Sequence, residues 1–117
     1  MALMHEMGIT VSVVEAVRER MEREGASTIK EVRLRVGKLT ALEPLALSFC
    51  FDAVSRGTPL EGARLLIEEV AVRGRCRGCA TEFVMEGYLL EPCPRCGGAN
   101  ILRLSGTELE IVSIDVE

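Results

Sequence analysis

Two Cys-x-x-Cys motifs, set in a segment rich in glycine and proline, constrain the fold of this chain more than any other feature. Cys76-Arg-Gly-Cys79 and Cys93-Pro-Arg-Cys96 are separated by thirteen residues, close to the spacing of four-cysteine zinc sites. The surrounding residues 73–104 hold five glycines and two prolines. About thirty residues of this composition bury too little apolar surface to fold alone, so we expect a metal ion to cross-link them.

Zinc is the metal that these four cysteines favour. Because cysteine supplies all four ligands, the ion keeps no open coordination position, and the site is predicted to be structural rather than catalytic. The alternatives are a pair of disulfides or redox-active dithiols, but a cytosolic chain keeps its thiols reduced. The fifth cysteine, Cys50, lies on a predicted helix, where we expect a buried free thiol.

The rest of the chain alternates helical and strand patterns. Apolar residues at helical spacing predict a helix over residues 4–24 that ends at Gly25. Its expected buried stripe consists of Met7, Val11, Val14, Val17 and Met21. Residues 32–36 alternate apolar side chains with arginines, which predicts a half-buried strand, and residues 64–72 and 107–116 also have strand patterns.

A second helix is expected from residue 43 to Arg56-Gly57. Thr40 and Glu43 have the spacing of a capping box, and Pro44 suits a first helical turn. The predicted buried face has two rows, Leu45, Phe49 and Ala53 on one and Ala46, Cys50 and Val54 on the next.

These elements predict an α+β fold. Two helices would pack on a three-stranded mixed sheet containing a parallel strand-helix-strand crossover, and a four-cysteine zinc-ribbon module would be inserted in it. Residues 1–72 plus 105–117 would form the α/β domain and residues 73–104 the zinc domain. We expect the residues between the two cysteine pairs to form a short hairpin.

Composition excludes several classes of function. The chain carries 14 basic and 18 acidic residues, which argues against general binding to nucleic acid or anionic lipid. No apolar run approaches the roughly 18 residues of a membrane span, and the first residues lack the basic segment of a secretory signal, so we expect a cytoplasmic protein. The chain has a single histidine, His5, and no cysteine that is free to pair with it. It also has no Ser/His/Asp set and no glycine-rich phosphate loop. We therefore predict that it is not an enzyme.

Several short motifs occur in a characteristic order along the chain. They are Met4-His-Glu6, Glu31-Val-Arg-Leu-Arg-Val-Gly37, Leu42-Glu-Pro44, Gly57-Thr58, Glu61-Gly-Ala63, the two cysteine pairs and Glu108-Leu109. Together they resemble the HypA/HybF family of nickel metallochaperones, which act in the maturation of nickel-iron hydrogenase. The resemblance covers nearly the whole chain, and it implies a nickel-binding domain of two helices and three strands beside a structural zinc domain.

The resemblance also implies a nickel site. His5 and Glu6 would bind Ni(II) together with backbone nitrogens, and Glu43 matches the place of a further ligand, although capping the second helix is an equally good role for it. Nitrogen and oxygen donors suit Ni(II). In the family the histidine is ordinarily the second residue, whereas Met1-Ala-Leu3 precede Met4 here, which leaves the complete ligand set open.

Partners follow from the same resemblance. The protein would cooperate with a HypB-type maturation GTPase and deliver nickel to the hydrogenase large-subunit precursor, with urease as a second target in some members. Monomer and homodimer are both open. We expect the partner surface at the apolar edge formed by Met4, Met7 and Ile9.

Two other functions compete with this interpretation. A zinc-ribbon adapter would bind RNA or a protein machine through Arg73, Arg75, Arg77, Arg95 and Arg103. The acidic chain argues against it, as does the presence of only Phe83 and Tyr88 to stack on bases within the module. A dithiol oxidoreductase would instead need reactive cysteines that zinc does not protect.

Overall fold

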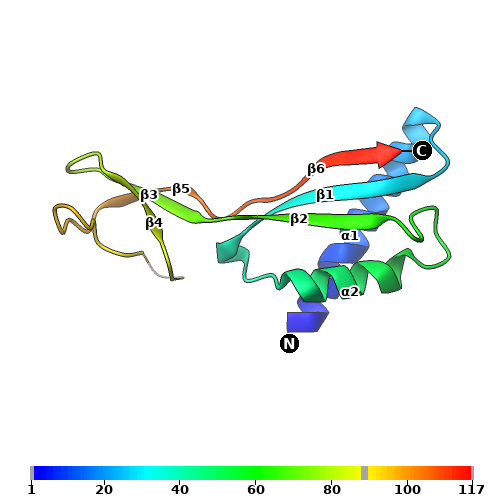
Figure 1. Ribbon diagram of the computed structural model, residues 1–117, viewed down its shortest axis with the longest axis horizontal. Coiled ribbons are helices and arrows are strands. Elements are labelled where there is room, and N and C mark those ends of the chain that lie inside the picture. Colours follow the sequence, from blue (N-terminus) through cyan, green and yellow to red (C-terminus); the bar gives the residue numbers. More distant parts are fainter. Residues whose placement is uncertain (1, 88–89, 117) are drawn as a thin grey trace. The chain divides into compact units, whose positions relative to one another are not determined.

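The computed structural model describes residues 2–87 and 90–116, with side chains from His5 onward. The elements in chain order (Figure 1) are α1 (Ala2–Glu24), β1 (Ile29–Gly37), the 3-10 helix η1 (Lys38–Thr40), α2 (Pro44–Ser55), β2 (Arg64–Val70), β3 (Val72–Cys76), β4 (Glu82–Met85), β5 (Ile101–Ser105) and β6 (Leu109–Val116). Neither helix is long and apolar enough, over the residues described, to cross a membrane. The chain forms two compact units. The first comprises Met1–Leu34, Leu42–Glu68 and Glu110–Glu117, and the second comprises Arg35–Ala41 and Glu69–Leu109.

The first unit combines α1 and α2 with a three-stranded sheet of order β2-β1-β6. Figure 1 shows β1 and β2 running in the same direction, connected through α2, while β6 runs in the opposite direction. The predicted α+β class and the mixed sheet are therefore confirmed. The core is almost entirely aliphatic, and its most buried side chains, each at most 1% exposed, include Val17, Val32, Leu34, Leu47 and Phe51.

β1 carries the predicted alternation. Val32, Leu34 and Val36 are buried, whereas Arg33 is exposed. The strand predicted over residues 64–72 is present as β2 but is not continuous, because β2 ends at Val70 and β3 starts at Val72. Between the two strands, the Ala71 carbonyl accepts a hydrogen bond from the Ser105 hydroxyl (2.7 Å).

α1 matches the helix predicted over residues 4–24. It ends before Gly25, whose φ of 71° is the left-handed conformation that commonly follows a helix, and the Ala26 amide donates to the Met21 carbonyl (3.0 Å) across this end. Val14, Val17 and Met21 are buried, as the stripe predicted.

The stripe is wrong in the first half of α1. Val11 is 38% exposed, whereas Glu6 and Thr10, one position earlier, are 0% exposed. Hydropathy alone favours the opposite arrangement, but hydrogen bonds offset part of the cost of burying these two polar residues. Glu6 Oε2 accepts from the Glu43 amide (2.7 Å), and the Thr10 hydroxyl donates to the Glu6 carbonyl (3.0 Å) and the Met7 carbonyl (2.9 Å).

One predicted row of α2 is also wrong. Leu45 is 79% and Phe49 64% exposed, and Ala53 is exposed as well. In the second predicted row Cys50 is 0% exposed, as expected for a core thiol. The buried residues of the helix are Leu47, Cys50, Phe51 and Ser55. Because most residues of α2 are apolar, hydropathy does not select the buried face, and packing on the core does.

The start of α2 differs from the predicted capping box. The Thr40 hydroxyl donates to the Gly37 carbonyl (2.8 Å) within η1, and does not cap α2. Glu43 is the N-cap residue, and its Oε1 accepts from the Leu45 amide (3.3 Å). The capping role considered for Glu43 is therefore present.

The second unit contains an antiparallel sheet of order β4-β3-β5. The hairpin expected between the two cysteine pairs is wrong, because β3 and β4 form a hairpin around the first pair and β5, beyond the second pair, adds to the other edge of β3. The sequence did not predict β5. Its alternation of apolar and polar residues, Leu102-Arg103-Leu104, is too short to indicate a strand.

The core of this unit is small. It consists of Val72, Cys76, Met85, Cys93 and Ile101, with Leu39, Cys79 and Phe83 packed against it. Close to it, the Gly37 amide donates to the Glu108 carbonyl (2.7 Å) and the Leu39 amide to the Gly106 carbonyl (2.8 Å). These bonds bring two glycines together, and a Cβ on Gly37 would overlap the Gly106 carbonyl group.

This contact predicts opposite effects of one substitution at two glycines. Gly37→Ala is expected to destabilise the protein by about 1–3 kcal/mol, because a backbone segment must move to admit the methyl group. Gly8→Ala is the matched control, since nothing lies within 4 Å of its Cβ position on α1, and it should stabilise by about 0.5–1 kcal/mol. Thermal unfolding of both variants measures the difference, and equal stabilities would contradict the prediction.

Candidate metal centre

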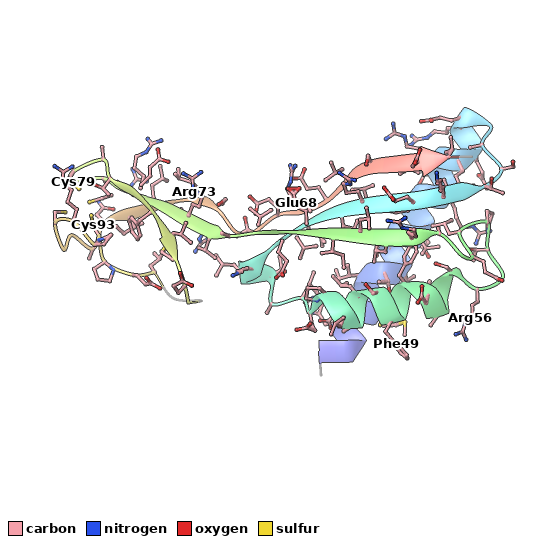
Figure 2. All side chains as sticks on the ribbon, in the orientation of Figure 1. Phe49, Arg56, Glu68, Arg73, Cys79 and Cys93 are labelled. Atoms are coloured by element: carbon pink, nitrogen blue, oxygen red, sulfur yellow. The ribbon has the colours of Figure 1, made fainter. Side chains whose placement is uncertain are left out.

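The four cysteines of the second unit come together at one point. Cys76 ends β3 and Cys79 follows in the next turn, while Cys93 and Cys96 flank the turn before β5. Their Sγ atoms all lie within 4.8 Å of one another. Cys76 lies 3.5 Å from Cys96 and Cys79 3.6 Å from Cys93. Figure 2 shows Cys79 and Cys93 at the same end of this unit.

These distances fit a metal ion better than disulfides. All five cysteines are free thiols, and a disulfide would require sulfur atoms about 2.05 Å apart. In a tetrahedron with zinc–sulfur bonds of about 2.3 Å, neighbouring sulfur atoms are about 3.8 Å apart. The four sulfur atoms thus have the spacing of a tetrathiolate metal site.

Backbone turns place the two cysteine pairs in similar ways. The Ala80 amide donates to the Cys76 carbonyl (2.8 Å), and the Gly97 amide to the Cys93 carbonyl (2.9 Å). The closing residues, Ala80 and Gly97, have φ of 65° and 74°, so glycine is favoured but not required in this turn. The Cys96 amide donates a hydrogen bond to Cys93 Sγ (3.5 Å) across the second of these turns.

The local hydrogen bonds shift the pKa of three thiols. The Thr81 hydroxyl, and then its backbone, lower the pKa of Cys79 from 9.0 to about 6. The Cys79 amide is the main group that lowers the pKa of Cys76. At Cys96 the Gly98 amide acts in the same direction, but the three neighbouring sulfur atoms together raise the pKa to about 11. Metal binding must displace the remaining protons, so metal affinity falls as the pH falls.

The residues expected to bind nickel lie in the first unit. His5 is exposed on α1. Glu6 is 0% exposed, and its Oε2 accepts from the Glu43 amide (2.7 Å), so the carboxylate connects α1 to the start of α2. Glu6 Oε1 is buried and has no hydrogen-bond partner among the residues that the structure describes. Glu43 itself is exposed.

The structure gathers one of the two expected ligand sets. Within the described part of the chain, the four cysteines form a group of metal-ligating side chains with all ligand atoms within 4.8 Å, and His5, Glu6 and Glu43 do not. Sequence reasoning missed the burial of Glu6. The signal that could have revealed it is the i, i+4, i+7 spacing of Glu6, Thr10 and Val13 within the apolar stripe.

Comparison with known families decides the relationship. A family model described as "Hydrogenase/urease nickel incorporation, metallochaperone, hypA" matches residues 4–116. This chain belongs to the HypA family. The HypA family consists of metallochaperones and maturation factors, so the protein is not an enzyme, as the sequence predicted.

Relatives and solved structures agree with membership of the HypA family. Hydrogenase maturation factor HypA of Geotalea uraniireducens is 46% identical over 97% of this chain and 100% of its own length. The factor of the same name from Streptomyces avermitilis is 44% identical over 97% of this chain and 88% of its own. The solution structure of the Ni metallochaperone HypA from Helicobacter pylori, 19% identical, covers 95% of this chain and 96% of its own with a TM-score of 0.64. A further solution structure of a HypA protein is 21% identical, and the match covers 97% of each chain with a TM-score of 0.71. Both solution structures have the same fold as this chain.

The sulfur cluster of this HypA-family chain predicts the effect of cysteine substitutions. Replacing Cys76, Cys79, Cys93 or Cys96 by serine should remove bound zinc, measured by native mass spectrometry, and should abolish amide-exchange protection in β3, β4 and β5. The physical reason is that the core of the second unit is too small to fold without the cross-link. Cys50→Ala is the control and should keep one zinc ion. Zinc retained by all four serine variants would contradict the assignment.

Thr81 offers a test of the pKa shift. Thr81→Val removes the hydroxyl that lowers the pKa of Cys79, so protons should compete better for that sulfur. Zinc is then expected to be released at a higher pH during acid titration, by a fraction of a pH unit, while Thr107→Val, an exposed control, leaves the release unchanged. Identical release curves for wild type and Thr81→Val would show that this hydrogen bond does not set the affinity.

Proposed function

We propose that this chain binds Ni(II) and delivers it during the maturation of nickel-iron hydrogenase, with a second, structural Zn(II) held by the four cysteines. The observation that carries the nickel proposal is the carboxylate of Glu6. It lies next to the single histidine in the chain, and one of its oxygens is buried without a hydrogen-bond partner among the described residues.

A buried carboxylate oxygen without a partner costs free energy, about 1–3 kcal/mol or more for a charged group. A divalent cation bound at Glu6 Oε1 would remove that cost. Glu6 Oε2 is already held by the Glu43 amide (2.7 Å), so the free oxygen has a fixed orientation. Such a carboxylate is suited to complete a site that the exposed imidazole of His5 begins.

Nitrogen and oxygen ligands also suit the role of a carrier. His5, Glu6 and backbone nitrogens would bind Ni(II) without the tight retention that thiolates give. Glu43 is a further ligand in this proposal. Its Oε1 accepts a long hydrogen bond from the Leu45 amide (3.3 Å), and nickel would compete with this helix-capping contact.

The two metals would belong to different parts of the chain. Residues 1–72 plus 105–117 would serve as the nickel domain, and residues 73–104 as the zinc domain. The support for zinc is the set of four sulfur atoms within 4.8 Å, with no histidine or carboxylate among them. Zinc bound there would supply a structural cross-link and no catalytic chemistry.

The partners are part of the proposal. A HypB-type GTPase would act with this chain, and the large-subunit precursor of hydrogenase would receive the metal. The family description names both hydrogenase and urease incorporation, which supports urease as a second target. The partner surface expected at Met7 and Ile9 remains a prediction, since both side chains are half-buried and that of Met4 lies outside the described side chains.

The adapter function has less support. Arg73 and Arg75 both pair with Glu82, at 2.9 Å and 3.6 Å, so two of the five arginines are partly neutralised before they could contact phosphate. Phe83 is half-buried in the small core, and Tyr88 lies outside the described residues. Among the described residues, Phe83 is therefore not an exposed platform on which bases could stack beside the arginines.

Nickel titration followed by native mass spectrometry tests the proposal. The wild-type chain should bind one Ni(II) beside one Zn(II), and His5→Ala should weaken nickel binding at least tenfold while keeping zinc. Glu6→Gln retains an oxygen that can accept from the Glu43 amide but removes the buried charge, so it should weaken nickel binding without lowering thermal stability. Glu15→Gln, exposed on the same helix, is the control. Unchanged nickel binding by His5→Ala would overturn the proposal.

A chain that begins at Met4 tests the backbone ligands. Without residues 1–3, Met4, His5 and Glu6 would occupy the first helical turn, where backbone amides lack intrahelical acceptors and are available to a metal. We expect this chain to bind nickel more tightly than the full chain, measured in the same titration. Equal affinities would show that the side chains of His5 and Glu6 bind nickel without backbone nitrogens.

A further inference from the structure

The most exposed apolar side chains of the first unit lie together on α2. Leu45 is 79% exposed and Phe49, four residues later, 64% exposed. Residues with this spacing lie on one face of a helix. In Figure 2 the side chain of Phe49 points away from the sheet. We name this pair, Leu45 and Phe49, the α2 row.

The α2 row does not take part in packing α2 on the core. α2 packs on the core through its opposite face, where Leu47, Cys50 and Phe51 are at most 1% exposed. Leu45 and Phe49 contribute nothing to that core. Two large apolar side chains at adjacent turns of a helix are therefore exposed to water in the isolated chain, and burying them against another surface would be favourable.

The α2 row begins beside the proposed nickel site. Leu45 donates its amide to Glu43 Oε1 (3.3 Å), and the Glu43 amide in turn donates to Glu6 Oε2 (2.7 Å). Glu6 follows His5 directly in the chain. Two successive hydrogen bonds thus connect the start of the row to the residues proposed to hold the cargo. A protein docked on the row would have its own ligands close to the metal.

The charge around the α2 row defines the partner further. Glu43 and Asp52 are exposed on either side of it along the helix, and the first unit contains seven basic against thirteen acidic residues. Arg56 is the basic residue at the end of the helix. A docking surface with apolar residues in the centre and basic residues at the rim complements this arrangement.

We infer that Leu45 and Phe49 form the docking surface for a protein that exchanges Ni(II) with this chain, and that this partner presents an apolar surface bordered by basic residues. The inference rests on the proposed nickel function. A second copy of this chain is a poorer occupant, because pairing two α2 rows about a two-fold axis brings the acidic side chains of both first units together.

The α2 row also supplies what transfer of a metal requires. A carrier must release its ion to a partner without losing it to water. The ligands of the carrier and those of the partner must therefore reach the same ion while solvent is excluded. Apolar side chains at the border of the site exclude water when they are covered, and they contribute no ligand that would retain the ion. Glu43, between the row and Glu6, is a ligand that docking could displace.

The test uses the full-length, zinc-loaded chain and a double variant, Leu45→Gln with Phe49→Gln. Both changes are at exposed positions, so the fold, the zinc content and the nickel titration should be unchanged. Val84→Gln is the matched control, because Val84 is 53% exposed on β4. Binding of each chain to the purified HypB-type GTPase and to the large-subunit precursor is measured by calorimetry, and Ni(II) transfer is followed with nickel-loaded chain.

The double variant should bind at least one of these partners at least tenfold more weakly and transfer nickel more slowly, and Val84→Gln should behave as wild type. Wild-type affinity should also fall as salt is added, because opposite charges meet at the rim. Wild-type affinity of the double variant for both partners would overturn the inference. A wild-type dimer that the double variant converts to a monomer would overturn it in favour of a second copy.

Failure of the nickel proposal would be visible separately. It would appear as a wild-type chain that binds the partners but takes up no Ni(II) in the titration.

Discussion

The convergence of four sulfur atoms within 4.8 Å determines how the second unit can fold. Its apolar core contains five buried residues, two of which are the ligands Cys76 and Cys93. In the sheet β4-β3-β5, strand β3 ends at Cys76, and β4 and β5 begin a few residues after the first and the second cysteine pair. The turns that position the sulfur atoms therefore also set one end of each strand. Without a bond between the pairs, the remaining apolar contacts would have to compensate the conformational entropy of about thirty ordered residues, which they are too few to do.

In the first unit a single carboxylate is central both to packing and to the proposed nickel site. Glu6 occupies a position that an apolar side chain would ordinarily fill, and its two oxygens have different surroundings: one is bound to the Glu43 amide and the other has no partner among the described residues. A carboxylate kept in this state costs stability, and binding of a cation, as proposed for Ni(II), would recover that cost. Local frustration of this kind is typical of functional sites, where a residue that weakens the fold is retained for its chemistry.

The sequence was sufficient to predict the helices, strands and mixed sheet of the first unit and the four-cysteine cluster of the second, but not the three strands of the second unit. Each depends on local patterns: helical periodicity in α1, alternation in β1 and the spacing of Cys76, Cys79, Cys93 and Cys96. Which face of each helix is buried was harder to predict from the sequence. The exposure of Leu45 and the burial of Glu6 both depend on which face of a helix meets the core, and that choice is made by contacts between residues far apart in the chain, such as Glu6 with Glu43, thirty-seven positions away. The extra strand β5 is likewise formed by its pairing with β3 and has little pattern of its own.

The close sulfur pairs also have a meaning for the unfolded chain. Cys79 and Cys93 are 14 residues apart, and Cys76 and Cys96 are 20 apart, so each close contact joins one motif to the other. A bond across them closes a loop of the length at which a covalent cross-link removes about 3 kcal/mol of chain entropy from the denatured state. A metal ion bound by the four cysteines would therefore have nearly the same topological effect as a disulfide, but it would bind reduced thiols. A competing chelator or acid would open such a cross-link without any change of redox state.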